Sequence, residues 1–281
     1  MCPSGAIKFG VDERKGIYIP QVDEKTCTKC GTCLRVCPGW DVNLPDLSAE
    51  TFGTTERDPV LGRWLSCYVG YSSNRTLRYR CSSGGVVTQL LMFAMEEGLI
   101  DGAAVVRMSR EHPLRPEVFI ATSKDALLES VGSKYCPVPM NLVLREIREK
   151  EGQRFAVVGL PCHIEGLRKA ETVDRRLREK IAFHIGLFCG NVPRFHGTEY
   201  VLTARGINSR AVKDIAYRGE GWPGHMQVQL ERDRVLIPYR RYWDEGFGQY
   251  FATMRCKLCV DHLCELADLS CGDAWDVQMG Q

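Results

Sequence analysis

Four cysteines within eleven residues constrain this chain more than any other feature of its sequence. Cys27, Cys30, Cys33 and Cys37 follow the spacing C-x2-C-x2-C-x3-C, and Pro38 comes directly after the fourth. Three cysteines spaced in this way wrap a tight loop around one iron–sulfur cube, while the fourth points away from the loop. A zinc site or a disulfide loop is the alternative, but zinc sites prefer two CxxC pairs set well apart. The spacing therefore predicts a 4Fe-4S cluster of the ferredoxin type and a role in electron transfer.

The first residues of the chain look like the end of an earlier copy of the same motif. Cys2 opens the sequence C-P-S-G-A-I, and in two-cluster ferredoxins the fourth cysteine of each motif ligates the other cluster. We therefore expect Cys2 to complete the cluster held by Cys27, Cys30 and Cys33. Cys37 would then point toward a cluster whose first three cysteines are absent from this chain. The chain would begin inside a longer ferredoxin domain; the alternative is a free surface cysteine at position 2.

Composition and charge exclude several classes of protein. A net charge of +2 gives no basic field for nucleic acid. No apolar run reaches the roughly 18 residues of a membrane span, and the N-terminus lacks the apolar core of a signal peptide. Fourteen cysteines without a secretion signal favour metal ligation in a reducing cytoplasm over disulfides. The sequence therefore predicts a cytoplasmic protein with no nucleic-acid partner and no membrane span.

Alternating apolar segments predict a small N-terminal unit joined to a larger core. The ferredoxin-type segment covers 1–45, a polar and aperiodic linker covers 46–63, and the core covers 64–281 in two parts, 64–150 and 151–281. Within the core we expect strands at 66–71, 103–106, 118–121, 155–159 and 180–188, helices at 86–96, 142–150 and about 162–171, and a β-rich region at 215–239. Strands that alternate with helices indicate some parallel pairing, so the fold class is α/β (α+β overall) with a mixed sheet.

Two glycine-bearing turns in the core are candidates for binding a cofactor. The first comprises Ser82, Ser83, Gly84 and Gly85, with Thr88 in the helix that follows. Small residues at the start of a helix let backbone N–H groups approach a phosphate, although an ordinary serine N-cap has the same composition. The second turn carries a cation and an aromatic ring beside a glycine, and it is composed of Gly132, Ser133, Lys134 and Tyr135. It would complete a phosphate and ring site, or it is a surface turn with a solvated lysine.

Four further cysteines have the arrangement of a second cluster site. Cys162 and Cys189 each follow an expected strand, and Cys256 and Cys259 form a CxxC pair far downstream. The carboxyl ends of strands in α/β sheets are where sites gather, and four thiolates are the number that a second cube requires. A zinc site or a dithiol redox pair has a similar spacing, so the alternatives remain open at this point.

Several motifs in fixed order identify a resemblance. They are S-S-G-G-V-V-T (82–88), G-S-K-Y (132–135), G-L-P-C-H (159–163), G-L-F-C (186–189), Y-R-G-E-G-W-P-G (217–224) and C-K-L-C-x-D-x3-E-L-A-D-L-S-C-G-D (256–273). Together they resemble the beta-subunit family of coenzyme F420 hydrogenases and dehydrogenases, which includes 7-hydroxymethyl chlorophyll a reductases. The resemblance covers roughly 64–275 and implies a core that binds FAD and a 4Fe-4S cluster.

The resemblance also implies roles for individual residues. The core cluster falls on Cys162, Cys189, Cys256 and Cys259, and FAD falls on the two glycine-bearing turns. Pro161 and His163 are the candidate catalytic positions near the isoalloxazine ring, where some relatives carry a glutamine-like residue in place of His163. A role for His163 in packing or hydrogen bonding is favoured over proton transfer. The remaining cysteines fall outside this set, and Cys264 and Cys271 lie close enough to the CxxC pair to offer an alternative ligand set.

The predicted function is that of a flavin and iron–sulfur oxidoreductase. Ferredoxin or a partner subunit would exchange single electrons with the N-terminal cluster, and the core cluster would exchange them with FAD. FAD would then transfer a hydride to or from an organic acceptor such as coenzyme F420. Arg218, Trp222 and the Arg240–Arg241 pair would meet an anionic substrate group, or they are ordinary surface residues. The alternatives are a non-catalytic electron-transfer subunit of a larger complex and a structural iron–sulfur protein, and assembly into an oligomer or complex fits either electron-transfer role.

Overall fold

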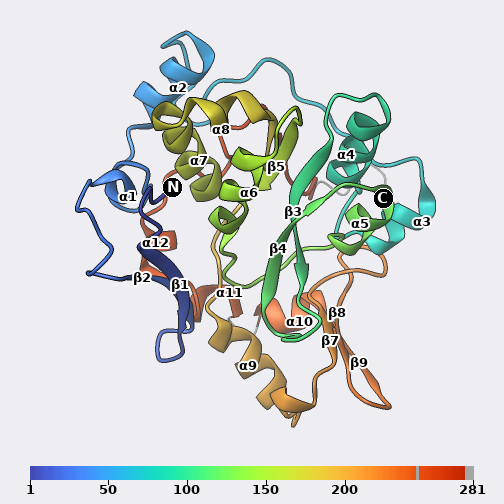
Figure 1. The fold of residues 1–281 in the computed structure, drawn as a ribbon. Coiled ribbons are helices and arrows are strands. Elements are labelled where there is room, and N and C mark those ends of the chain that lie inside the picture. Colours follow the sequence, from blue (N-terminus) through green and yellow to red (C-terminus); the bar gives the residue numbers. More distant parts are fainter. Residues whose placement is uncertain (245–246, 276–281) are drawn as a thin grey trace.

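The computed structural model describes residues 1–244 and 247–275, and a five-stranded mixed sheet lies at its centre (Figure 1). The strand order is β10 (Leu269–Cys271), β6 (Ile181–Leu187), β5 (Phe155–Gly159), β3 (Gly102–Met108) and β4 (Pro116–Ala121). The first four are parallel to one another, and β4 pairs with β3 in antiparallel register at one edge. The predicted α/β class with a mixed sheet is therefore confirmed.

Helices cover both faces of this sheet because its strands alternate apolar side chains between them. On one face, Ala104 and Val157 pack with helices α6 (Leu144–Glu149), α7 (Pro161–Val173) and α8 (Arg175–Lys180). On the other face, Ala103 and Ala156 pack with α4 (Val86–Glu96) and α5 (Lys124–Glu129). The four strand residues are almost completely buried. The sheet thus fixes where α7 and the loop after β6 begin, and these two segments carry Cys162 and Cys189.

A second hydrophobic core lies below the sheet in Figure 1 and is rich in aromatic residues. It joins a three-stranded antiparallel sheet, β7 (Asp214–Ala216), β8 (His225–Gln229) and β9 (Arg234–Pro238), to helices α9 (Phe195–Thr203), α10 (Tyr239–Asp244) and α11 (Phe247–Tyr250). The β-rich region predicted at 215–239 is therefore confirmed. The other elements are α1 (Thr32–Arg35), α2 (Leu44–Phe52), α3 (Arg75–Arg80), α12 (Met254–Lys257) and the short 3-10 turns Met140–Val143 and Ser209–Ala211.

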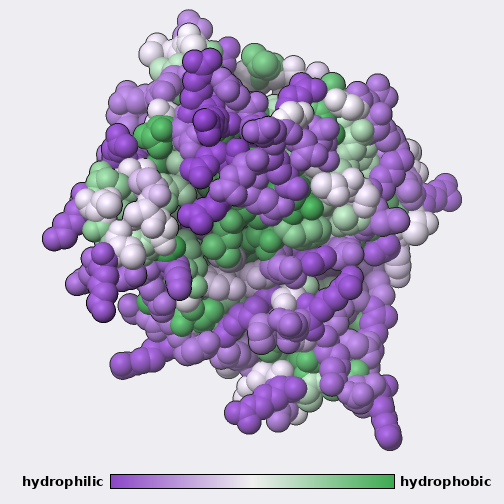
Figure 2. Space-filling view, viewed as in Figure 1, coloured by the Kyte–Doolittle hydropathy of each residue, from purple (hydrophilic) through white to green (hydrophobic). Residues whose placement is uncertain are grey.

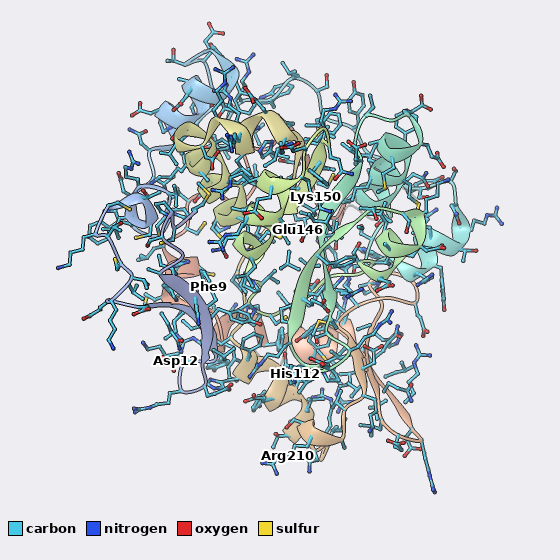
Figure 3. All side chains as sticks on the ribbon, viewed as in Figure 1. Phe9, Asp12, His112, Glu146, Lys150 and Arg210 are labelled. Carbon is cyan, nitrogen blue, oxygen red and sulfur yellow. The ribbon has the colours of Figure 1, made fainter. Side chains whose placement is uncertain are left out.

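The N-terminal segment is a hairpin that docks on the second core. Strands β1 (Ile7–Asp12) and β2 (Ile17–Val22) pair in antiparallel register, and Asp12 closes the turn by accepting the backbone N–H of Lys15 at 3.1 Å (Figure 3). At the tip of the hairpin, the backbone N–H of Phe195 donates to Gly16 O at 2.8 Å. These contacts hold the ferredoxin-type segment in one position against the core.

Local sequence patterns predict the central elements well but fail at two places. The expected helix at 86–96 and strand at 155–159 coincide with α4 and β5. The strand expected at 66–71 is wrong, because this segment has no sheet neighbour and instead crosses the glycine turn, where Ser72 N–H donates to Gly84 O at 2.7 Å. The expected aperiodic linker contains α2, which Asn43 caps by accepting Asp46 N–H and which packs its leucines against α7.

One face of the molecule has a mainly hydrophilic surface (Figure 2). Figure 2 shows hydrophilic residues over most of one face and a band of hydrophobic residues across its middle. On α6, which lies on this face, the Lys150 ammonium at the end of the helix is 3.4 Å from the Glu146 carboxylate (Figure 3). Among the residues that the structure describes, no helix is both long and apolar enough to cross a bilayer.

Candidate functional site

The N-terminal hairpin brings the ends of the ferredoxin-type motif together. The ladder ends at Ile7 and Val22, and just beyond it Asp23 N–H donates to Ala6 O at 2.8 Å. Cys2 precedes this end of the hairpin by four residues and Cys27 follows it by four. The fold therefore places Cys2 on the same side of the hairpin as the loop that begins with Cys27, as the two-motif interpretation expects.

The loop between Cys27 and Cys33 is exposed and strongly curved. Lys29 and Gly31 have φ values of 53° and 73°, in the left-handed region that turns a chain sharply. Cys30 and Cys33 are exposed, and a hydrogen bond between Cys30 Sγ and Thr32 Oγ1 (3.4 Å) lowers the pKa of Cys30 to about 7. A thiol with a lowered pKa is readily available as a thiolate, which is the form that binds metal.

The four core cysteines come from three separate segments that converge. Burial, followed by the nearby thiols of Cys162, Cys256 and Cys259, raises the pKa of Cys189 to about 12. Burial likewise raises the pKa of Cys162 to about 12, followed by the influence of Glu165 and of Cys256 and Cys259. Charge on Cys256 and Cys259 thus influences both Cys162 and Cys189, although the four cysteines lie on three segments: the start of α7, the loop after β6, and α12 with its following loop.

Backbone contacts hold these segments to one another. The Cys189 N–H donates to His262 O at 3.0 Å, and a short β-bridge pairs Pro193 with Ala252. The Cys256 Sγ accepts hydrogen bonds from the Val192 N–H at 3.4 Å and from the Thr253 hydroxyl at 3.2 Å. Donors of this kind that face a ligand sulfur are one of the means by which proteins tune cluster potentials.

The described residues do not form a preassembled site for a single metal ion. Within 1–244 and 247–275, no group of three or more His, Cys, Asp or Glu side chains is close enough to hold one metal ion. Ligands of a cube bind separate irons and therefore lie farther apart than the four ligands of one zinc ion. Cys264 is fully buried against Gly186 of β6. Burial, then Asp261 and Glu165, raise the pKa of Cys264, and Cys162 and Cys189 are also among the causes. Because Cys264 thus lies beside the core set, the alternative ligand set stays open.

The last cysteine of the N-terminal motif lies against the core site. Lys169 on α7 donates to Cys37 O at 3.4 Å and also to Asp41 O. A Cβ built on Gly166 of α7 would lie 3.2 Å from Pro38 Cδ, so the loop after Cys37 packs directly on this helix. The same helix carries Cys162 at its start. The fold thus places the loop that follows Cys37 against the helix that begins beside Cys162.

His163 and Pro161 form the start of α7 rather than an open reaction centre. Pro161 is buried at the first position of the helix, where its missing N–H costs nothing. The Leu160 N–H donates to His163 Nδ1 at 3.2 Å. Burial lowers the pKa of His163 to about 4, so the ring is neutral near pH 7. This environment agrees with the hydrogen-bonding role favoured for His163.

The two glycine-bearing turns meet each other. The Ser133 N–H donates to Ser82 Oγ at 2.7 Å, and this hydroxyl lies 3.5 Å from Arg218 O. Gly85 caps α4 with a φ of 76°, and no side chain bonds the first N–H groups of this eleven-residue helix. Thr88 is buried in the first turn of α4, and Ser83 and Gly84 are partly exposed. The turns and the loop at 217–224 therefore form one continuous surface.

The Lys134 side chain is neither solvated nor free for a phosphate, the two roles that the sequence offered, because it folds back onto its own turn. Its ammonium donates to three backbone carbonyls of its own turn, Ser130 O at 2.5 Å, Gly132 O at 2.9 Å and Val131 O at 3.3 Å. An ammonium has three N–H donors, so all are used. Burial lowers the pKa of Lys134 to about 8. In this structure Lys134 shapes the turn, and the backbone N–H groups of the first turn remain the available phosphate donors.

A buried network that the sequence analysis missed ties the cluster-bearing segments together. His184 on β6 lies 2.6 Å from Glu171 on α7 through Nε2 and 2.9 Å from Asp268 through Nδ1. Arg168 of α7 contacts both carboxylates, at 3.4 Å and 2.9 Å. Burial opposes the charged imidazole, but the two carboxylates outweigh it and raise the pKa of His184. A histidine inside an apolar strand was the available signal, because a buried polar group needs partners.

Comparisons with known proteins agree with this arrangement. Residues 67–145 and 152–281 match the profiles of the coenzyme F420 hydrogenase/dehydrogenase beta subunit, N-terminal and C-terminal parts. Residues 1–39 match a 4Fe-4S dicluster domain.

Individual relatives show the same likeness. The chain is 31% identical over 228 residues to the beta subunit of coenzyme F420 hydrogenase from Methanothermobacter thermautotrophicus, covering 77% of this chain and 76% of that one. It is 27% identical to a coenzyme F420-dependent sulfite reductase from Methanocaldococcus jannaschii, covering 97% of this chain and 40% of that protein. A chain of the F420-reducing nickel–iron hydrogenase complex from Methanosarcina barkeri aligns with a TM-score of 0.61 at 26% identity, covering 78% of this chain and 74% of that one.

Proposed function

Because this chain belongs to the beta-subunit family of coenzyme F420 hydrogenases and dehydrogenases, we propose that it is an iron–sulfur electron-transfer subunit of a larger oxidoreductase complex. Several relatives are themselves named as subunits. Their names favour the subunit interpretation over the self-contained enzyme that the sequence analysis placed first. The observation that carries the proposal is the convergence of four cysteines from three segments beside a docked ferredoxin-type motif.

The proposal assigns two clusters. Cys162, Cys189, Cys256 and Cys259 hold the core cluster, and the contacts that join Cys189 to His262 and Val192 to Cys256 support this set. The N-terminal cluster is held by Cys27, Cys30 and Cys33 with Cys2 as the fourth ligand, while Cys37 faces α7 through its loop. The match to a 4Fe-4S dicluster domain supports iron–sulfur chemistry at this end of the chain. A cytoplasmic location suits exposed cysteine ligands.

The proposal further includes FAD and coenzyme F420. The free N–H groups at the start of α4, with Ser82, Ser83, Gly84, Gly85 and Thr88, would hold FAD phosphates, and the turn at 132–135 would line the ring. A flavin, when bound, converts single-electron transfer into hydride transfer. The chain's own residues orient the ring, exclude water and supply Tyr135 as an aromatic wall. The relatives named for F420 support this coenzyme as the organic partner.

Two electron-transfer assays on the anaerobically purified chain test the proposal. Reduced viologen supplies single electrons, first to the clusters of the chain itself, whose visible absorption is lost on reduction, and then with F420 added as the acceptor. We expect viologen to reduce the clusters and the chain to catalyse reduction of F420. Loss of the F420 reaction alone would contradict the flavin and F420 assignment and leave the electron-transfer role standing, whereas the absence of both reactions would contradict the whole proposal. Cys67→Ser, which changes an exposed cysteine outside both sets, is the matched control and should behave as the unaltered chain.

A further inference from the structure

Arg218 is a buried arginine whose hydrogen bonds are incomplete. Its side chain is 3% exposed. The Nε donates to Pro223 O at 2.7 Å, and Nη1 donates to Asp273 Oδ2 at 2.6 Å and to the Tyr135 hydroxyl at 3.4 Å. Within the described part of the chain, Nη2 is enclosed and has no partner. Buried donors are nearly always paired, and leaving one unpaired costs about 1–3 kcal/mol.

Aromatic rings hold the guanidinium in place. Its central carbon lies 4.7 Å from the centre of the Tyr239 ring and 5.6 Å from that of Trp275. Tyr135 contacts Tyr239 and Trp243, so the wall continues into the second core. A guanidinium fixed by stacking and by an ion pair cannot turn to find another acceptor. The free Nη2 donors therefore have a fixed direction in this structure, which is the property of a group that receives a ligand.

The position of Arg218 is between the proposed flavin turns and the proposed core cluster. Its carbonyl lies 3.5 Å from Ser82 Oγ, and a Cβ built on Gly132 would lie 3.3 Å from the same oxygen. On the other side, its partner Asp273 follows Cys271, whose carbonyl accepts the Phe188 N–H at 2.9 Å. Phe188 precedes Cys189. The guanidinium is thus linked on one side to the cofactor turns and on the other to the loop of a cluster ligand.

We propose that Arg218 Nη2 binds the pyrimidinedione edge of a redox ring, the N1 and C2-carbonyl edge that flavins and 5-deazaflavins share. When such a ring takes up two electrons and one proton, it gains a negative charge that is centred on this edge. A fixed guanidinium stabilises that charge, and Asp273 moderates the effect by neutralising part of the cation. Arg218 is thereby a residue that sets the potential of the bound ring. The inference rests on the proposed function, since it requires a ring at this place.

Two variants that remove charges of opposite sign, Arg218→Gln and Asp273→Asn, separate this role from a structural one. FAD and a 5-deazaflavin are each titrated into the anaerobic chain, and the dissociation constant and midpoint potential of the bound ring are measured. Arg218→Gln should weaken binding of the reduced ring about tenfold relative to the oxidised ring, and so lower the potential, because the lost hydrogen bond acts mainly on the charged, reduced form. Asp273→Asn should raise the potential, because it removes the opposing charge. Arg218→Lys keeps the charge and should recover part of the loss.

The control is Arg232→Gln, which removes an exposed arginine from the turn between β8 and β9 by the same substitution. It should leave both potentials unchanged. An effect confined to FAD or to the deazaflavin supports the proposal and identifies the ring that Arg218 binds. Equal potentials in all variants, or shifts of the same sign in Arg218→Gln and Asp273→Asn, would overturn it. If the unaltered chain binds neither ring, the flavin part of the proposed function fails as well, which is a distinct result.

Discussion

Glu171→Gln is expected to lower the free energy of unfolding by about 3 kcal/mol, because it removes one of two carboxylates that flank a buried imidazolium. Glu171 is 6% exposed, and its Oε1 lies 2.6 Å from His184 Nε2. Glutamine keeps the shape of the side chain and one hydrogen-bond acceptor. It leaves Asp268 as the one carboxylate of this network that faces the positive charges of His184 and Arg168. Chemical denaturation of the metal-free chain at pH 6 measures the change. Glu179→Gln is the matched control, since its ion pair with Arg175 is exposed and should be worth less than about 0.5 kcal/mol.

The size of this effect should depend on pH in a defined direction. The pKa of His184 is raised in the folded protein, so its contribution is complete below its unfolded value of about 6.5 and is lost as pH rises through the folded value. The pKa of Asp268 is lowered to about 2 by His184 and Arg168, which outweigh burial. Its contribution is complete above about 3.9 and is lost as pH falls toward 2. A difference between Glu171→Gln and the unaltered chain that grows as pH rises above 7 would contradict this assignment.

Cys162→Ser is expected to remove the core cluster and leave the N-terminal one. Serine keeps the volume of the side chain but does not supply a thiolate, and the other three ligands lie on two different segments. Iron should fall by about four atoms per chain. Electron paramagnetic resonance of the reduced chain should retain one of two signals, and the F420 reaction should be lost because the proposed core cluster would no longer pass electrons on.

Two substitutions of the same kind make this result specific. Cys67→Ser changes an exposed cysteine and should retain all of the iron. Cys264→Ser changes a fully buried cysteine beside the core set. Loss of the core signal in Cys264→Ser but not in Cys162→Ser would show that the alternative ligand set is the true one.

The sequence alone predicts the parts of this molecule that local patterns determine. The helix at 86–96 and the strand at 155–159 have the apolar periodicity of their final environment, so their bounds coincide with α4 and β5. Two of the core cysteines follow buried strands and two form a CxxC pair, and the structure joins their segments by backbone contacts, while their role as cluster ligands stays a prediction. The segment at 66–71 has the composition of a strand, but pairing depends on a free sheet edge, which its residues do not encode.

Other features depend on contacts between distant parts of the chain and have no local signature. His184 and Asp268 are 84 positions apart, and Arg218 and Asp273 are 55 apart. Asp268 and Asp273 are two of many carboxylates in the sequence, and only the folded structure shows that they are the partners of His184 and Arg218. The role of Lys134 also escapes the motif, because a lysine beside glycine suits a phosphate site equally well until its three carbonyl partners are known.

Iron and acid-labile sulfide in the anaerobically purified, unaltered chain test the central claim most directly. Two sets of converging thiolates that each hold a cube predict about eight irons and about eight sulfides per chain. Zinc in place of iron, or four irons or fewer after full reconstitution, would contradict the account.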